Sequence, residues 1–401
     1  MRTNNFYMIP ALVLIFLSSP AFVAAQTPQA ASPLQLPKSM HTQMKDHARI
    51  TVGIKSGDIV GSDNRALQAA VDYVASLGGG TVEIGPGDYL MRDSLHLRAH
   101  VTVRGTWNQT VLRKARSAAS ALKVDGDYGE EQITVVSPAG FEVGDGVAVW
   151  DKNSGGFHTT VARITGRDGN TFAISLPLNA DCMVSDGAQA ATVFPIISGY
   201  HVEGARVEDL SIEGDKKQNV NLNGCRGGGI FLYRCHGAVV VRCTVRNYNG
   251  DGISFQQCND VSIQRCLSEG NGRYGISIGH KDTDNLLRNN HVRGNHEDGI
   301  FFRNETEGMA GHRNRLENNI IENNGVGREA AGIRVRGETR DLVFTKNIIR
   351  DTRSGGARKQ VVGVLIEENA GAITLNDNSI DAGTKVEDRR KAKTVSGNER
   401  H

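Results

Sequence analysis

The sequence predicts an all-β protein, a right-handed parallel β-helix in which short strands wind into a solenoid of stacked coils. A Gly-hydrophobic step recurs along the C-terminal half, and short stretches of alternating apolar and polar residues flank it. The composition agrees, with 47 Gly and only 5% aromatic residues in 401. Many short strands joined by tight turns have this profile, and helical bundles do not.

The Gly-hydrophobic step occurs six times. It stands at Gly229-Ile230, Gly252-Ile253, Gly275-Ile276, Gly299-Ile300, Gly332-Ile333 and Gly363-Val364. The first three intervals are 23, 23 and 24 residues, and the later two are 33 and 31, as if loops were inserted. A unit this short cannot bury its apolar face alone, so stacked units must share one continuous core.

Two further positions repeat within each unit. An apolar residue follows the step by two at Leu232, Phe255, Ile278, Phe302, Val335 and Ile366. A small polar residue recurs later at Cys243, Cys266, Asn290, Asn319, Asn347 and Asn378. The period of two predicts strands, and the repeated Asn predicts a hydrogen-bonded ladder along the axis. The pairs Cys235/Cys258 and Cys243/Cys266 fall in adjacent coils, where either disulfides or buried thiols fit.

The first 25 residues have the features of a signal peptide. Arg2 precedes the apolar run PALVLIFLSSPAFVAA, and small residues stand before Gln26. No second long apolar stretch follows, so we expect a secreted or periplasmic protein without a membrane span. Residues 26–48 read as a flexible lead-in and residues 381–401 as a polar tail, which leaves 49–380 for the β-helix.

Two elements are expected besides the coils. SDNRALQAAVDYVASLGGG begins with helix-capping residues, places apolar residues on one face and ends in Gly, so it predicts an amphipathic helix that caps the open end of the solenoid. Residues 133–178 depart from the repeat, with alternating segments separated by Gly-rich turns. They predict a small antiparallel β insertion.

The stretch DNRALQAAVDYVASLGGGTVEIGPGDYLMRDSLHLRAHVTVRGTW resembles the N-terminal part of the pectate-lyase-like superfamily. The Gly-Ile repeats that follow are similar to the β-helix repeat of this group. The resemblance covers most of residues 50–380 and implies the fold and a polysaccharide partner. It leaves the activity open, because the superfamily includes lyases, hydrolases, epimerases and non-catalytic binders.

Alternation along each strand predicts which side chains point outward. One ladder is Phe231, Ser254, Ser277, Phe301, Arg334 and Leu365, and the next is Tyr233, Gln256, Gly279, Arg303, Arg336 and Glu367. We therefore expect a solvent-facing polar patch centred on YGISIGHKDTDNLLRNNHVRGNHEDGIFFRNE, residues 274–305.

β-Elimination of a uronate polysaccharide is the first mechanism that this patch suggests. It requires a cation at the carboxylate, a base and an acid. The candidate catalytic residues are His280 or Lys281 as base, Tyr274 as acid and Arg303 at the carboxylate. The candidate substrate-binding residues are Arg334, Arg336, Glu305 and Glu338. Asp282 and Asp284 are the candidate ligands for Ca²⁺, the one cofactor considered.

Three alternatives remain open. Asp251 and Asp298 stand two coils apart, about 9.6 Å by strand spacing, near the upper limit for inverting glycoside hydrolases. NGDGISF resembles the polygalacturonase N-T-D-G motif, although the adjacent Asp pair and R-I-K triplet of that family are absent. YGISIGH with DGIFFR resembles the mannuronan epimerase motif, in which Tyr274 and, displaced by one residue, His280 match in type. Ser277 stands where that motif has Asp, and its later catalytic Asp falls near Arg303. The third alternative is a protein that binds glycans without catalysis.

Net charge gives no reason to expect nucleic acid, since 46 basic residues nearly balance 44 acidic ones. The sequence thus predicts a secreted β-helix protein that acts on a polysaccharide, with β-elimination preferred to hydrolysis.

Overall fold

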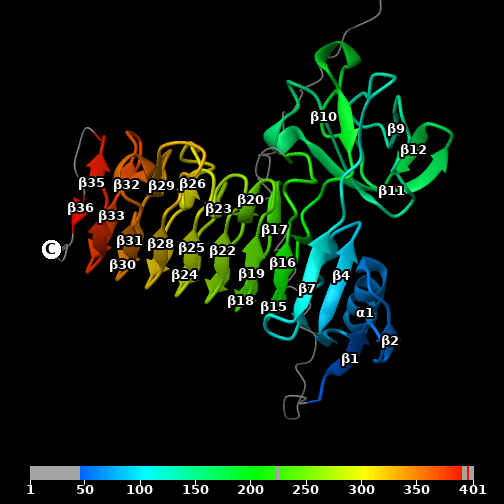
Figure 1. Cartoon of the computed structure of the whole chain (residues 1–401), viewed down its shortest axis with the longest axis horizontal. Helices are drawn as coiled ribbons and strands as arrows, with labels where there is room; N and C mark the ends of the chain where they lie inside the picture. Colours follow the sequence, from blue (N-terminus) through cyan, green and yellow to red (C-terminus); the bar gives the residue numbers. More distant parts are fainter. Residues whose placement is uncertain (1–45, 223–225, 391–394, 397–401) are drawn as a thin grey trace, which may run out of the picture. The chain divides into compact units, whose positions relative to one another are not determined.

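The computed structural model describes residues 46–222, 226–390 and 395–396, and in them the predicted parallel β-helix is present. Strands of successive coils pair in parallel, and the coils follow one another in chain order (Figure 1). The predicted signal peptide (1–25) and nearly all of the lead-in lie outside the described residues. No helix in the described part is long and apolar enough to cross a membrane.

Three parallel sheets form the walls of the solenoid. Sheet A has twelve strands, in spatial order β2 (Ile59–Val60), β1 (Ala48–Gly53), β3 (Gly80–Ile84), β6 (Val101–Arg104), β15 (Arg206–Glu208), β18 (Val239–Val241), β21 (Ser262–Gln264), β24 (Leu286–Arg288), β27 (Arg315–Glu317), β30 (Leu342–Thr345), β33 (Ile373–Asn376) and β36 (Val395–Ser396). Sheet B has nine, β34 (Ser379–Asp381), β31 (Ile348–Arg350), β28 (Ile320–Glu322), β25 (His291–Arg293), β22 (Leu267–Glu269), β19 (Thr244–Arg246), β16 (Ser211–Glu213), β7 (Thr110–Lys114) and β4 (Gly87–Met91). Sheet C has nine, β35 (Thr384–Asp388), β32 (Gln360–Ile366), β29 (Ala330–Val335), β26 (Ile300–Phe302), β23 (Ile276–Ile278), β20 (Asp251–Gln256), β17 (Gly228–Tyr233), β14 (Ile197–Tyr200) and β5 (Leu95–His96).

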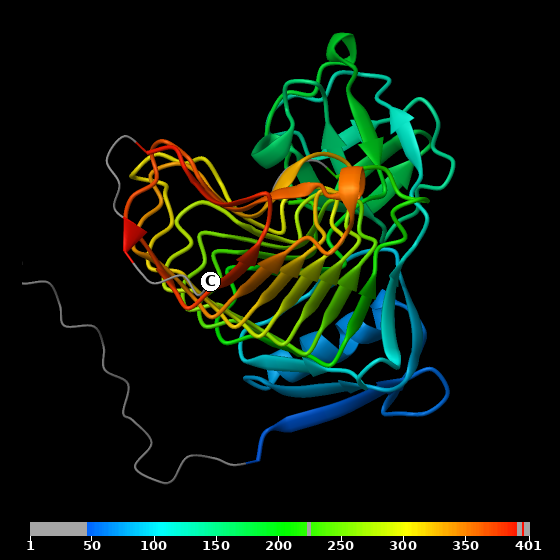
Figure 2. The same ribbon diagram turned by 60° about the vertical axis from the view of Figure 1, so that its left-hand side comes forward.

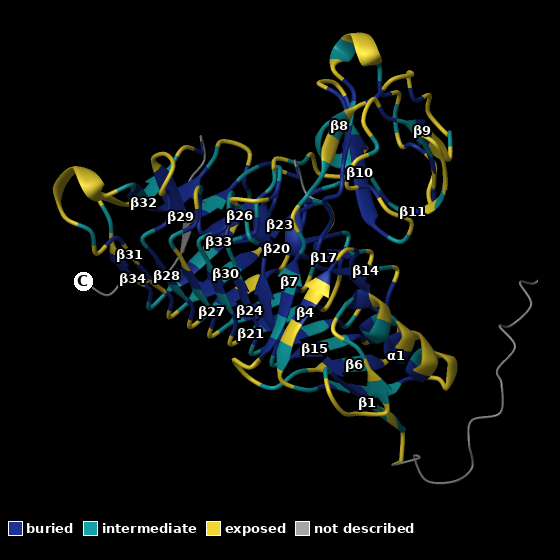
Figure 3. Ribbon diagram, turned by 45° about the vertical axis from the view of Figure 1, so that its right-hand side comes forward, coloured by how far each residue is buried: buried dark blue, intermediate teal, exposed yellow. Residues whose placement is uncertain are grey.

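The Gly-Ile step sets the register of sheet C. Ile253, Ile276, Ile300 and Ile333 lie opposite one another in successive strands, and all four are completely buried. Each such side chain contributes about 1.5–3 kcal/mol to folding by leaving water. Figure 3 shows that the strands of the coils are mostly buried or intermediate, while the exposed residues lie mainly in loops.

The predicted capping helix is α1 (Asn64–Ser76), with Asp63 as its N-cap, whose carboxylate accepts from Arg65 N–H at 3.0 Å. Its buried face includes Leu67, Val71 and Val74, which join the core of the first coils. The helix thereby covers apolar side chains that would otherwise face solvent. Figure 2 shows α1 in blue beside the first strands of the solenoid.

The antiparallel insertion is also confirmed. Its six strands are β8 (Ala119–Ala121), β13 (Gln189–Ala191), β10 (Gly146–Trp150), β11 (Thr160–Asp168), β12 (Thr171–Ile174) and β9 (Gln132–Thr134). β8 and β13 lie outside the expected range 133–178. β8 comes soon after the chain leaves β7, β13 comes just before it returns to β14, and the two strands pair with each other. A 3-10 turn, η1 (Gly156–His158), projects from this sheet, and two others stand at η2 (Val184–Asp186) and η3 (Gly355–Ala357).

The predicted Asn ladder runs along the turn between sheets A and B. The side-chain oxygens of Asn319, Asn347 and Asn378 each accept from both the backbone and side-chain amides of the preceding member, beginning with Asn290, at 2.9–3.0 Å. Each buried amide is therefore satisfied along the solenoid axis.

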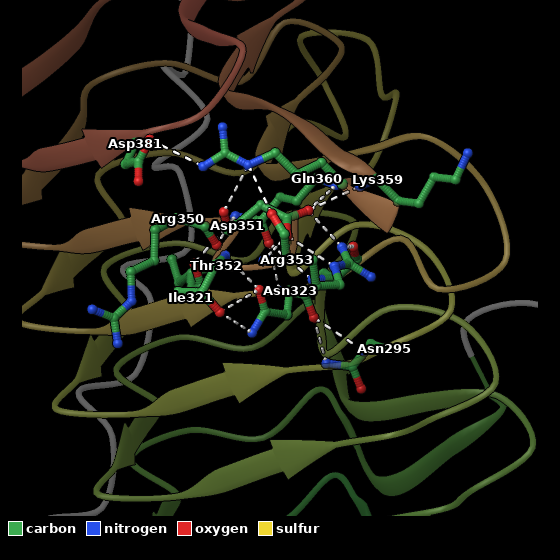
Figure 4. Close-up of polar contacts among 12 residues, drawn as sticks. Asn295, Ile321, Asn323, Arg350, Asp351, Thr352, Arg353, Lys359, Gln360 and Asp381 are labelled. Atoms are coloured by element: carbon green, nitrogen blue, oxygen red, sulfur yellow. Dashed lines mark hydrogen bonds and ion pairs between the residues drawn. The ribbon is translucent and has the colours of Figure 1, made fainter. Parts of the chain in front are cut away.

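A second ladder, which sequence reasoning missed, runs along the turn between sheets B and C. Asn271, Asn295 and Asn324 bond in the same way, and Gln360 replaces Asn at the last coil with its side-chain oxygen 2.9 Å from Asn324 Nδ2. Beside this end lies Asp351, whose carboxylate accepts from several surrounding N–H groups (Figure 4).

The cysteines predicted to form either disulfides or buried thiols are free thiols in the structure. Cys235, Cys258, Cys243 and Cys266 are all buried and free. They occupy core positions in the turns and donate weak S–H hydrogen bonds to backbone carbonyls, as Cys258 does to Gln256 at 3.2 Å.

The expected tail contains strands. β35 pairs in parallel with β32, and β36 pairs with β33, so the solenoid continues beyond residue 380. The side chains of β35 are exposed or only partly buried, and among the described residues this strand forms the edge of sheet C, which fits the polar character of the segment.

Candidate functional site

The predicted outward ladders lie on the outer face of sheet C, but most of their members are not exposed to solvent. Gln256, Ser277 and Phe301 have at most 4% of their surface exposed. The expectation of a solvent-facing patch is therefore wrong for these positions. The directions follow from strand alternation, whereas the exposure depends on what covers the sheet.

The covering groups come partly from the insertion. The Phe157 ring in η1 lies 6.1 Å from the Tyr233 ring and 5.9 Å from the His280 ring, between centroids. The Arg226 guanidinium packs 5.0 Å from the same Phe157 ring. Phe157 and Arg226 were not among the sequence candidates, and no periodicity reveals them.

A second cover is a stack of side chains across three coils. The rings of Tyr274 and Phe301 are parallel, with centroids 3.9 Å apart. Arg273 packs on the Tyr274 ring at 4.6 Å and Arg336 lies 5.9 Å from the Phe301 ring. Burial raises the pKa of the Tyr274 phenol to about 12, so it remains protonated at neutral pH.

Asp251 is a completely buried carboxyl beneath this stack. Arg273 Nε lies 3.7 Å from its Oδ1, and Tyr274 N–H donates to Oδ1 at 3.4 Å. Burial raises the pKa of Asp251 to about 6, although Arg273 and Arg303 oppose the shift. A carboxyl that titrates near 6 can serve as an acid at neutral pH.

Asp298, the other carboxyl proposed for hydrolysis, is held more firmly. Its Oδ2 lies 3.0 Å from Arg334 Nε and its Oδ1 accepts from Ala331 N–H at 2.7 Å. Burial raises its pKa, against the effect of Arg334. Arg334 in turn reaches Glu367 at 3.4 Å, so this predicted substrate-binding residue is engaged by two carboxylates.

His280, Glu305 and Arg303 form a connected group. His280 Nδ1 lies 2.9 Å from Glu305 Oε2, out of line for a good hydrogen bond, and Arg303 Nε lies 3.5 Å from Glu305 Oε1. The side chains of His280 and Arg303 are 18% and 22% exposed, so this group reaches solvent, as Arg334 and Arg336 also do.

Several polar atoms beside this group have no partner. Both amide atoms of Gln256, Nη1 of Arg303 and Oδ2 of Asp251 are buried without a well-aligned hydrogen bond to any described residue. Gln256 lies over Gly279, where a Cβ would stand 2.5 Å from Gln256 Cγ. Unsatisfied buried groups are costly and rare, and in a native protein a water, an ion or a functional role accounts for each of them.

Not all of the sequence candidates join this cluster. Lys281 lies in the turn after β23 with a φ of 51°, exposed, and lines a shallow surface groove of about 450 Å³ together with Arg234, Glu307 and His312. Arg336 pairs with Glu367 at 3.0 Å. Glu338 accepts a hydrogen bond from the backbone N–H of Glu307 and so holds a loop.

The two calcium candidates lie in different surroundings. Asp282 is completely buried and accepts from Cys258 N–H at 2.8 Å and Gly279 N–H at 2.5 Å. Asp284 is exposed and pairs with Arg313 at 2.8 Å. Within residues 46–390, apart from the gap at 223–225, no group of three or more His, Cys, Asp or Glu side chains is placed to hold a metal ion. The structure therefore does not bring Asp282 and Asp284 together as a site.

The comparisons with known proteins agree with this architecture. A family model for a right-handed β-helix region matches residues 196–399, just over half of the chain, and the chain belongs to this family. The resemblance to pectate-lyase-like proteins is thus confirmed for the fold. No curated protein matches the sequence.

Solved structures with a similar fold include three whose names mention carbohydrates or their enzymes. A glycoside hydrolase is 11% identical, with 88% of this chain and 96% of that chain covered and a TM-score of 0.48. The A-module of the Azotobacter vinelandii mannuronan C-5 epimerase AlgE4 is 13% identical, with coverages of 86% and 100% and a TM-score of 0.35. A tailspike of Acinetobacter baumannii bacteriophage AP22, solved with a capsular saccharide, is 11% identical, with coverages of 82% and 73% and a TM-score of 0.26. These likenesses concern the fold alone.

Proposed function

We propose that this protein is a lyase that cleaves an acidic polysaccharide by β-elimination on the outer face of sheet C. The observation that carries the proposal is a pair of buried donors on this face, Gln256 Nε2 and Arg303 Nη1, which have no aligned acceptor among the described residues. His280 lies close to Arg303 through their common neighbour Glu305. A uronate carboxylate offers the acceptors that these buried donors lack.

The group at His280 supplies the base. His280 Nδ1 lies 2.9 Å from Glu305 Oε2, and the negative charge of Glu305 favours a proton on Nδ1, which leaves the Nε2 lone pair available to accept a proton. In the reaction His280 removes the proton next to the carboxylate, whose developing charge Arg303 and Gln256 stabilise. The C–O bond to the leaving sugar then breaks, and a carbon–carbon double bond forms.

The leaving oxygen needs a proton, for which Asp251 is the better donor. With a pKa of about 6, part of this carboxyl is protonated near neutral pH, whereas the phenol of Tyr274, with a pKa of about 12, is a weaker acid. Lys281 is left out of the mechanism, because it lies in the groove beside the turn.

Hydrolysis is the second candidate, supported by the raised pKa values of Asp251 and Asp298. In that reaction Asp251 protonates the glycosidic oxygen and Asp298 activates a water. The ion pair between Asp298 and Arg334 at 3.0 Å opposes this role, because Arg334 must first release the carboxylate.

The test compares the full chain with two variants on a panel of polygalacturonate, alginate, glycosaminoglycan and neutral dextran. We expect ultraviolet absorbance from the unsaturated product with one uronate polymer and none with dextran. His280→Ala should lower kcat by at least about 100-fold, since general bases contribute about 10²–10⁴. Arg288→Ala, an arginine of sheet A paired with Glu317, should leave the rate unchanged.

The other outcomes are equally informative. Absorbance that persists in His280→Ala removes the assigned base, and new reducing ends without absorbance establish hydrolysis. If neither product forms, calorimetric titration with the same polymers decides whether the face binds glycans without turnover.

The pH profile tests the role of Asp251. Because the protonated carboxyl is the acid, kcat should fall as the pH rises through about 6, where Asp251 loses its proton. In Asp251→Asn the rate should be low and this descending limb absent. A limb that persists in the variant assigns the acid to another group.

We also predict that the protein is exported, because the polysaccharide on which it would act lies outside the cytoplasm. N-terminal sequencing of the mature protein checks it, with Gln26 as the expected first residue.

A further inference from the structure

A separate cluster occupies the outer face of sheet C in its first two coils. His96 at the end of β5 lies in register with Ser198 on β14, and Ser198 with Phe231 on β17. These residues thus begin the ladder that continues to Ser254 and Ser277. Sequence reasoning missed them, because the Gly-Ile step begins only at Gly229.

A continuous chain of hydrogen bonds links three side chains. Ser198 Oγ lies 3.0 Å from His96 Nδ1, and His96 Nε2 lies 3.0 Å from Asp93 Oδ2. A carboxylate only accepts, so the imidazole proton stands on Nε2 toward Asp93. Nδ1 then carries the lone pair and accepts the Ser198 hydroxyl proton, which is the arrangement of an activated serine.

The cluster opens into a cavity of about 300 Å³ between the first coils and the insertion. Ser198 and Asp93 are each 2% exposed, while the His96 side chain is 29% exposed. The insertion contributes Val161, Ala162 and Leu176 to the lining of the same cavity. A nucleophile, a base and apolar side chains therefore line one small space.

Arg163 supports the cluster in two ways. Its Nε donates to Asp93 Oδ2 at 2.6 Å and so fixes the carboxylate that orients His96. Its two Nη groups form no hydrogen bond with the described residues. Arg163 is one of the residues that line the same cavity, so its guanidinium supplies a positive charge beside Ser198 for an oxyanion formed there.

We propose that Ser198, His96 and Asp93 form a catalytic triad that hydrolyses small acyl esters, such as an O-acyl group on a sugar. The Ser198 oxygen attacks the acyl carbon while its proton moves to His96 Nδ1. The ester C–O bond breaks, and the leaving alcohol takes this proton. Water, activated by His96, then hydrolyses the acyl-serine and releases the carboxylic acid.

A role in holding the insertion on the first coil explains only part of this arrangement. The ion pair of Asp93 with Arg163 fastens the insertion to the first coil by itself. It needs neither the imidazole nor the serine, and it gives no reason for the serine, imidazole and carboxylate to connect in order beside a cavity. The inference is independent of the lyase proposal, whose residues lie two or more coils away.

The experiment uses the full chain with 4-nitrophenyl acetate and a fluorophosphonate probe. We expect hydrolysis that Ser198→Ala lowers at least about 100-fold, because the triad serine contributes far more than this in known cases. Peptide mass analysis should place the phosphonate on Ser198. Ser254→Ala is the matched control, a buried serine two coils along the same ladder, and should keep full activity.

Asp93→Asn should also lose activity, but it breaks the Arg163 pair as well. If that variant does not fold, Ser198→Ala decides the question, since it removes a single hydroxyl and its fold can be checked by circular dichroism. Three results would overturn the triad: no hydrolysis at all, hydrolysis that survives in folded Ser198→Ala, or phosphonate on another residue. In each case only the ion pair that fastens the insertion to the first coil would remain as the role of Asp93 and Arg163.

Discussion

Replacing Gly275 by Ala should destabilise the protein by about 3 kcal/mol, because overpacking between coils adds to a lost hydrogen bond. A Cβ at this position would stand 2.2 Å from Val292 Cγ1, 2.7 Å from Asn295 Nδ2 and 2.7 Å from the backbone oxygen of Gly299. The backbone oxygen cannot move without disturbing the next coil. Denaturant unfolding followed by circular dichroism measures the effect.

The matched control is Gly308→Ala. A Cβ there meets nothing within 4 Å, and the backbone needs no positive φ. This variant should change the free energy of unfolding by less than about 0.5 kcal/mol. Equal stability of Gly275→Ala and wild type would show that the coils tolerate a wider spacing than the structure indicates.

The same contact explains why the Gly-Ile step was a reliable signal in the sequence. At Gly299, Gly332 and Gly363, a Cβ would stand 2.3–2.5 Å from an Ile side chain that follows in sheet B. Because every coil packs onto the next at the same spacing, the requirement repeats with the coil. The fold and the Asn ladder were therefore predictable from the coil repeat, and the capping helix from its own helical pattern and capping residues.

The candidate site was predictable only in part. Strand alternation correctly placed Gln256 and Arg303 on one outer face, yet it gave no information about Phe157, which reaches this face from the insertion. Lys281 follows the end of β23 at Ile278, where strand alternation no longer predicts the direction of a side chain. Its φ of 51° shows that the chain has already turned there.

The Ser198 cluster was beyond sequence reasoning for a related reason. Asp93 and Ser198 are separated by the whole insertion, and Arg163 comes from within it. No spacing rule joins residues across such an inserted sheet. Only the parallel pairing of β5 with β14 brings His96 beside Ser198.

Acid should destabilise the protein partly through Asp351. Its Oδ2 accepts from Gln360 N–H at 2.8 Å and Lys359 N–H at 2.9 Å, and Arg353 Nη2 donates to it at 2.6 Å (Figure 4). Burial acts to raise the pKa, but these donors outweigh it and lower the pKa of Asp351 from 3.8 to about 2. The folded state therefore holds this carboxylate ionised where the unfolded chain is protonated.

The sign follows from proton binding. Between pH 4 and 2 the unfolded chain binds a proton that the folded chain does not, so stability falls as the pH falls, by about 2 kcal/mol from this group. Asp351→Asn should lack this part of the acid dependence. It should also lose about 3 kcal/mol at neutral pH, because an amide N–H₂ would face backbone donors. Unfolding free energies measured from pH 2 to 7 test both effects.

Asp284→Asn is the control that compares the buried Asp351 network with an ion pair on the protein surface. The bond from Arg313 lowers the pKa of Asp284 too, but the pair is exposed. Solvent screening should limit its effect to less than about 0.5 kcal/mol at neutral pH. If both variants lose the same stability, the N–H groups around Asp351 do not act as a buried network, and the order at the last coils must come from apolar packing alone.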